Sequence, residues 1–241
     1  MIDIILLVIF GVVIWMVASD GPWSAAIVFV SVLLSGLLAM NYFEPLANFL
    51  QSSVASSFEW QHRIDIIAFY GILCAGIFAF RAAGEALLPT YAELQGPVYE
   101  GARWGFAVLT GYLLTAIICM SLHLAPLPRE FLGFTPERGN LLGTAPDRQW
   151  LALTQYVSEK SMQRVRPDGR PVIFDGAVFP SNPADNTSLR IWSSLPIKYA
   201  TRRQLYALGG TAPGAVSTPP PPPISPSSSR SQDPTAGTGG F

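Results

Sequence analysis

Glu59 and His62 are the pair whose residue types and spacing come nearest to a metal site in this sequence. They stand three positions apart, so a helix would place both side chains on one face. A zinc site needs three or four protein ligands, and the chain holds only one other histidine, His123, at the end of an apolar run. We therefore expect both histidines to be interfacial side chains, and we expect no metal site.

Carboxylates within apolar runs are the other candidates for chemistry, because an ionised group inside a bilayer is costly and commonly functional. Asp3 and Asp65 each lie near the start of such a run, where water and the positive end of a helix dipole stabilise a carboxylate. This position favours capping at the interface over a proton relay. The sequence also has no phosphate loop, nucleophile elbow or HExxH motif. We expect a protein that is not an enzyme and holds no cofactor.

Apolar helices are the elements that would carry these residues. Half of the residues are hydrophobic and 13% are charged, an unusual balance for a soluble domain. Four runs approach the length that crosses about 30 Å of hydrocarbon: residues 2–18, 23–43, 64–80 and 104–122. The sequence predicts an all-α membrane protein whose residues 1–124 form a four-helix transmembrane domain. Asp20-Gly21-Pro22 is so short a connection that the first two helices should pack as antiparallel neighbours.

A more polar stretch, residues 81–103, precedes the last of the four runs. It carries three glutamates between apolar residues, which predicts an amphipathic helix at the membrane surface. Pro89 and Pro97 should break that helix.

Small residues recur at the spacing that lets helices approach closely in a bilayer. Gly101 and Gly105 are four positions apart, Gly111 follows in the same run, and Gly71 lies in the run before it. Packing of the third helix on the fourth is one use of these glycines, and self-association into a homo-oligomer is the other. Cys74 and Cys119 lie in the same two runs, and we expect both to be buried thiols.

The second half of the chain is polar and rich in proline, and we expect it to lie outside the membrane as a largely irregular tail. Within residues 125–208 a short helix is predicted near 148–162, capped by Asp147, for docking on the membrane surface or on helix ends. Asp175-Gly176 is a turn pair that predicts a short hairpin. Residues 209–241 are rich in Pro, Ser and Gly and should be disordered, with Pro219 to Pro223 available to a protein partner. Basic residues are scattered, so no nucleic-acid partner is expected.

The membrane half resembles a known family of bacterial inner-membrane proteins. The resemblance rests on the opening Met1-Ile2-Asp3-Ile4-Ile5-Leu6-Leu7, on a corner formed by Phe43, Glu44, Pro45 and Leu46, and on a third helix opened by Ile67-Ala68-Phe69. A Gly-rich fourth helix that begins near Gly101 and Gly105 continues the same order. In these features residues 1–124 are similar to the colicin V production (CvpA) family.

The resemblance implies a multi-pass protein of the bacterial inner membrane, with a non-enzymatic role in toxin production or export or in maintenance of the cell envelope. It implies no catalytic residue. Two alternatives stay open: a membrane scaffold that recruits partners through its tail, and a subunit of a small oligomeric channel or transporter. Ser31, Ser35, Thr110 and Thr115 are the mid-membrane polar residues that a pore would use. The net-basic second half favours cytoplasmic termini.

Overall fold

The computed structural model describes the backbone of residues 1–53, 58–87, 96–127, 131–134 and 139–161, and of short stretches between 164 and 199. Side chains are described for 1–53, 63–87, 96–127, 131–134 and 139–161, and for Leu195 and Tyr199. The side chains of Glu59 and His62 therefore lie outside what is described, as do Pro89 and residues 209–241 with the Pro219 to Pro223 run.

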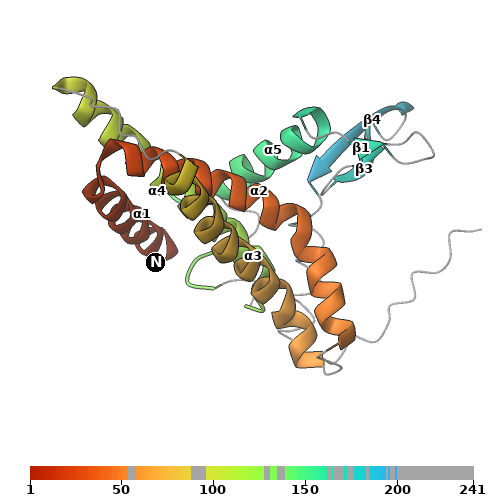
Figure 1. Ribbon diagram of the computed structural model, residues 1–241. Coiled ribbons are helices and arrows are strands. Elements are labelled where there is room, and N and C mark those ends of the chain that lie inside the picture. Colours follow the sequence, from red (N-terminus) through yellow and green to blue (C-terminus); the bar gives the residue numbers. More distant parts are fainter. Residues whose placement is uncertain are drawn as a thin grey trace, which may run out of the picture.

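Four long helices make up the first half of the chain (Figure 1). They are α1 (Ile2–Ser19), α2 (Gly21–Ser53), α3 (Phe58–Leu87) and α4 (Pro97–Leu124). Each contains a segment long and apolar enough to cross a membrane. The predicted class of a membrane protein with four apolar helices is confirmed. The tail departs from an all-α chain by adding short strands.

The helices extend beyond the apolar runs that identify them. α2 continues through Pro45 to Ser53 and does not end at the Glu44-Pro45 corner, and its second half bends away from its first (Figure 1). An internal proline removes one backbone hydrogen bond and kinks a helix without having to end it. The polar stretch 81–103 is likewise divided, with 81–87 extending α3 and 97–103 opening α4. Pro97 suits the first helical position, where its missing N–H costs nothing.

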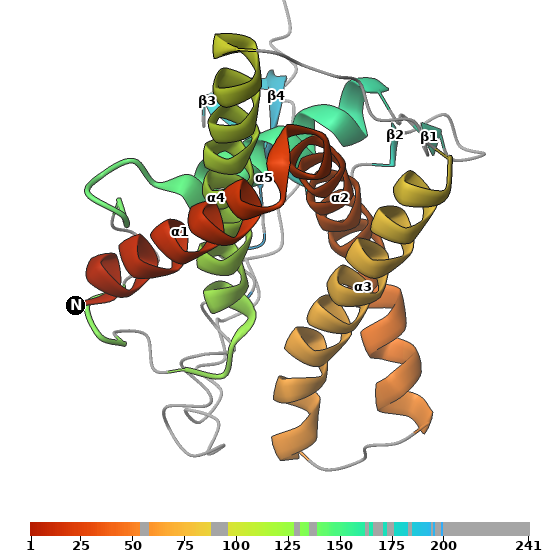
Figure 2. The same cartoon turned by 60° about the vertical axis from the view of Figure 1, so that its left-hand side comes forward.

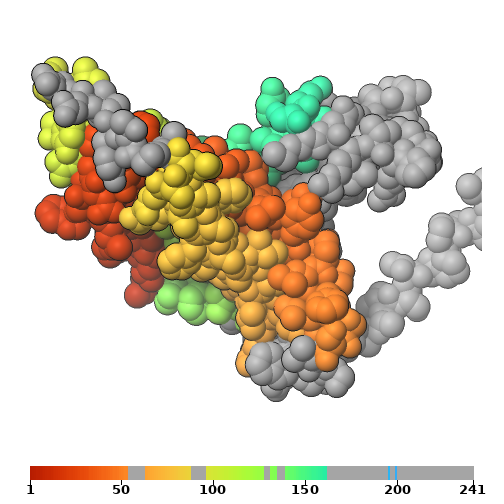
Figure 3. Space-filling view, viewed as in Figure 1, coloured from red at the N-terminus to blue at the C-terminus, as the bar shows by residue number. Residues whose placement is uncertain are grey.

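The packing partners of the helices differ from those predicted. α1 touches α2 mainly near their connecting turn and lies instead across α4, while α3 packs along α2 (Figures 2 and 3). α3 and α4 barely meet; one link between them is a 2.7 Å hydrogen bond between the hydroxyls of Tyr70 and Ser121. The predicted α1–α2 and α3–α4 pairs are therefore replaced by α1–α4 and α2–α3, with α2 also packed on α4.

In its described residues the tail contributes a further helix and two small sheets. α5 (Pro146–Tyr156) is followed by one π-helical turn, η1 (Val157–Ser161). β1 (Arg164–Val165) pairs with β2 (Pro171–Val172), and β3 (Gly176–Asn182) pairs with β4 (Asp185–Ser193), both antiparallel. The partner of β3 thus follows it in the chain, so Asp175-Gly176 is not the turn of a hairpin as predicted.

Candidate functional site

The tail helix α5 is built into the transmembrane bundle. Trp150 is buried in the same apolar core as Met40 of α2 and Ile117 of α4. A Cβ placed on Gly36 would come within 2.9 Å of both the Trp150 ring and the Ile117 side chain. α5 thus docks on the bundle itself: it packs on the side of α4, reaches Gly36 of α2, and contacts the end of α4 through His123.

The buried face of α5 carries one acidic residue among apolar and neutral ones. Asp147, Trp150, Leu151 and Thr154 are buried, at the i, i+3, i+4, i+7 spacing of a single helix face. Leu153, although apolar, is exposed. Asp147 is also not the helix cap: the N-cap position is Ala145, with a φ of 47°.

Asp147 instead forms a buried pair with His123 at the end of α4. His123 Nε2 lies 2.9 Å from Asp147 Oδ2, and the two side chains are 0% and 1% exposed. The expectation that His123 is an interfacial side chain is wrong, since α5 covers it. An acidic and a basic group excluded from water are tolerated only when they are paired and hydrogen-bonded. This pair is the closest approach to a functional site among the described residues.

Neighbouring side chains enclose the pair on several sides. The Phe134 ring packs edge-on against His123, with centroids 5.1 Å apart. The thiol of Cys119, one turn before His123 on α4, is buried beside Asp147. Cys119 is thus buried as predicted, whereas Cys74 is exposed on α3. The second carboxylate oxygen of Asp147 has no protein hydrogen-bond partner among the described residues.

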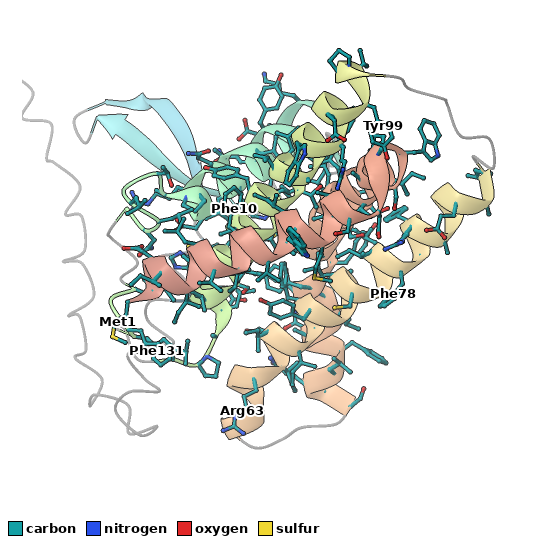
Figure 4. All side chains as sticks on the ribbon, turned by 90° about the vertical axis from the view of Figure 1, so that its left-hand side faces the viewer. Met1, Phe10, Arg63, Phe78, Tyr99 and Phe131 are labelled. Atoms are coloured by element: carbon teal, nitrogen blue, oxygen red, sulfur yellow. The ribbon has the colours of Figure 1, made fainter. Side chains whose placement is uncertain are left out.

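The N-terminus of α1 closes the same region. The backbone N–H of Ile2 donates to Leu132 O at 2.9 Å, and Asp3 Oδ1 accepts a 2.8 Å hydrogen bond from Leu141 N. Met1 and Phe131 accordingly lie together at the start of α1 (Figure 4). Asp3 therefore ties the segment between α4 and α5 to α1.

This arrangement can hold α5 in place. Because the His123–Asp147 pair is buried, the chemistry that it could perform is limited. No group of three or more His, Cys, Asp or Glu side chains among the described residues could hold a metal ion. Acid–base chemistry would require a reactant to reach a pair that is sealed by α4, α5 and Phe134. The direct consequence of the geometry is a polar attachment between α4 and α5.

A second polar cluster lies at the opposite end of the bundle. Arg81 contacts Asp20 at 3.6 Å and Glu85 at 3.0 Å, and Arg103 contacts Glu100 at 3.4 Å while donating to the carbonyl of Ala18. These pairs are partly exposed, so each contributes little stability. They mark the end of the bundle at which α1 turns into α2.

The predicted packing glycines have different roles. A Cβ on Gly111 would lie 2.9 Å from Ile14 and 3.2 Å from Phe10 of α1, so Gly111 permits the close approach of α1 to α4 (Figure 4 labels Phe10 at this crossing). Gly71, Gly101 and Gly105 have open space where a Cβ would be. Three of the four glycines are thus not used in packing within the described chain.

The residues of the family-like corner are part of the α2–α3 contact. Phe43 is buried and meets Phe69 edge-on, with ring centroids 6.0 Å apart. Glu44, Pro45 and Leu46 continue α2 through its bend. Asp65, predicted at a helix start, lies two turns into α3 and is buried.

The mid-membrane hydroxyl residues point into the chain. Ser31, Ser35, Thr110 and Thr115 are all buried. Ser31 and Thr110 each donate to a carbonyl one turn earlier on the same helix, at 2.7 Å. A pore formed between several copies would not be lined by these side chains.

The fold defines a multi-pass helical membrane protein with a tail helix incorporated into its transmembrane bundle. No protein-family model, curated protein or solved structure matches the chain. The similarity of residues 1–124 to the colicin V production family therefore stays a prediction from the sequence.

Proposed function

We propose that the chain is a non-enzymatic membrane scaffold of the bacterial inner membrane. Its role would be the one that the resemblance to the colicin V production family implies, in toxin production or export or in maintenance of the cell envelope. The observation that carries the scaffold role is the incorporation of α5 into the bundle through Trp150 and the His123–Asp147 pair.

The anchoring extends close to the Pro-rich segment. Leu195 and Tyr199 are buried in the same core as Trp150. Residues 209–241 therefore begin only ten residues after a point that is fixed to the bundle. A run such as Pro219 to Pro223 favours the polyproline II conformation, which aromatic-lined grooves of partner domains bind at a low entropic cost. A partner bound there would be held at a defined place on the membrane.

The channel alternative has less support. The hydroxyl residues that could line a pore are buried within one chain, and two of them bond to their own helix. Assembly with a second copy through the open faces at Gly71, Gly101 and Gly105 is compatible with the scaffold role. Cytoplasmic termini would present the Pro-rich segment to cytosolic partners.

Deletion of residues 209–241 tests the scaffold role. In a bacterial strain that lacks the protein, we expect the full chain to restore toxin export or envelope integrity and the truncated chain to fail, at equal membrane levels. A full-length variant with Pro219 to Pro223 replaced by serine serves as the matched control for length. It should fail as the truncation does, because the polyproline conformation is lost. Full activity of the truncated chain would contradict the proposal.

A further inference from the structure

We propose that residues 139–145 form a strained clasp, which the first turn of α1 holds closed over the thiol of Cys119. When that turn is withdrawn, the clasp relaxes and uncovers Cys119 and the neighbouring His123–Asp147 pair. The inference depends on the backbone of the clasp and on its contacts with α1, and it does not depend on the scaffold role.

The backbone of the clasp makes a left-handed turn. Leu141, Leu142 and Gly143 follow one another with φ values of 55°, 56° and 85°, and the backbone N–H of Thr144 donates a 3.1 Å hydrogen bond to Leu141 O across the turn. Ala145 adds a further positive φ of 47°. Glycine adopts this conformation readily, whereas in leucine and alanine the Cβ then comes too close to the following carbonyl oxygen. The two leucines and the alanine are therefore held in a strained conformation.

The start of α1 holds this turn in place. Asp3 Oδ1 accepts a 2.8 Å hydrogen bond from the backbone N–H of Leu141. The Leu141 side chain is buried in an apolar cluster with Ile2 and Leu6 of α1 and with Cys119 of α4. A strained backbone persists only where the surrounding structure over-determines it. The first turn of α1 supplies both a polar and an apolar part of that restraint.

The clasp and α1 together cover a buried polar region at this end of the bundle. Cys119 lies beside Asp147, whose Oδ2 is 2.9 Å from His123 Nε2. Withdrawal of the first turn of α1 removes the acceptor of the Leu141 N–H and part of the apolar cluster, so the cost of the left-handed turn is no longer offset. α5 keeps its attachment through Trp150, which is buried in a separate core cluster. The position of α1 therefore controls access to the pair without release of α5.

A pair of substitutions at Leu142 tests the strain. The side chain of Leu142 is 76% exposed, so its removal costs little packing. Leu142→Gly removes the Cβ that makes the left-handed turn costly, and Leu142→Ala keeps that Cβ and serves as the matched control. In a full chain with Cys74→Ala, reconstituted in vesicles of phosphatidylethanolamine and phosphatidylglycerol, alkylation of Cys119 by a membrane-permeant maleimide measures the open fraction of the clasp.

We expect alkylation of Cys119 to be several-fold slower in the Leu142→Gly chain and unchanged in the Leu142→Ala chain. Slowing by the same factor in both chains would overturn the inference, because loss of the leucine side chain and not relief of strain would then explain it. An unchanged or faster rate in the Leu142→Gly chain would also overturn it.

Asp3→Ala tests the role of α1, because it removes the acceptor of the Leu141 N–H. We expect several-fold faster alkylation of Cys119, and faster amide hydrogen exchange in residues 139–145 but not in α5. Ile4→Ala, at a residue of the same turn that is 67% exposed, is the control and should change neither. Asp3→Asn keeps an acceptor oxygen, should fall between the two, and replaces Asp3→Ala if that chain does not fold.

Unchanged alkylation and exchange in the Asp3→Ala chain would show that α1 does not hold the clasp. An equal rise of exchange in residues 139–145 and in α5 would likewise overturn the inference, because the clasp would then open only when α5 is released.

Discussion

An Asp147→Ala variant is expected to lose about 1–3 kcal/mol of unfolding free energy, because removal of one partner of a buried hydrogen-bonded pair leaves the other partner buried without that hydrogen bond. The remaining His123 ring would stay enclosed by Phe134 and α5 with no carboxylate at 2.9 Å. The measurement is the unfolding midpoint of the purified chain in detergent, titrated with sodium dodecyl sulfate. An Arg148→Ala variant on the exposed neighbour is the matched control and should change little.

The double variant His123→Leu with Asp147→Ala separates the loss of the pair from the loss of volume. We expect the double change to cost clearly less than the sum of the two single changes, because no buried polar group is then left without this hydrogen bond. Additive costs would show that His123 and Asp147 do not interact, and the attachment of α5 would have to rest on apolar packing alone.

Trp150→Ala is the second change with a large expected effect, a loss of about 3–5 kcal/mol through the cavity left between α2, α4 and α5. The expected structural result is release of α5. In a Cys74→Ala background the buried thiol of Cys119 reports that release, since it lies beside Asp147 of α5, in a buried cluster with Phe134 and Leu141. Alkylation of Cys119 by a membrane-permeant maleimide should become faster in the Trp150→Ala chain. Unchanged alkylation would mean that the indole does not hold α5 in place.

A glycine substitution at the same contact gives the complementary result. Gly36→Leu should also release α5, because even a Cβ at this position comes within 2.9 Å of the Trp150 ring and Ile117. Combined with Trp150→Ala, the same leucine has room and should restore part of the lost stability. Gly71→Leu, at a glycine with open space around it, is the control and should leave Cys119 protected.

The four spanning helices could be predicted because their signal is local. An uncharged run of about twenty residues has few alternatives to a helix in a bilayer, whatever its neighbours are. The ends of α2, α3 and α4 were less predictable, since residues such as Glu44 and Arg81 are compatible with a helix that continues into water.

The local signal does not reveal which helices pack against each other. Asp20-Gly21-Pro22 brings α1 and α2 together only at their turn, and the choice of α4 as the partner of α1 depends on the space that Gly111 leaves for Phe10 and Ile14. Such shape complementarity between distant segments cannot be recognised from the sequence of either segment alone.

The His123–Asp147 pair was missed for a related reason. An aspartate just before an amphipathic pattern has the properties of a helix cap. Pro146, however, opens the helix and puts Asp147 inside it, on the face that also carries Trp150 and Leu151. A carboxylate that shares a helix face with two apolar residues is buried with them and requires a polar partner. This requirement could have predicted a buried partner for Asp147. Its partner lies 24 residues earlier in the chain, which no local pattern reveals.

The incorporation of α5 into the transmembrane bundle is tested most directly by crosslinking in native membranes. Tyr112→Cys and Gln149→Cys, placed in a Cys74→Ala, Cys119→Ala background, replace two side chains that share a 2.8 Å hydrogen bond between α4 and α5. Phe78→Cys with Gln149→Cys is the control, since Phe78 is exposed on α3 (Figure 4). We expect a short bis-maleimide to join the first pair within one chain, as shown by mass spectrometry of the linked peptides, and not the second. Failure of the first pair to crosslink, while each cysteine alone reacts with a single maleimide, would contradict the docking of α5 on the bundle.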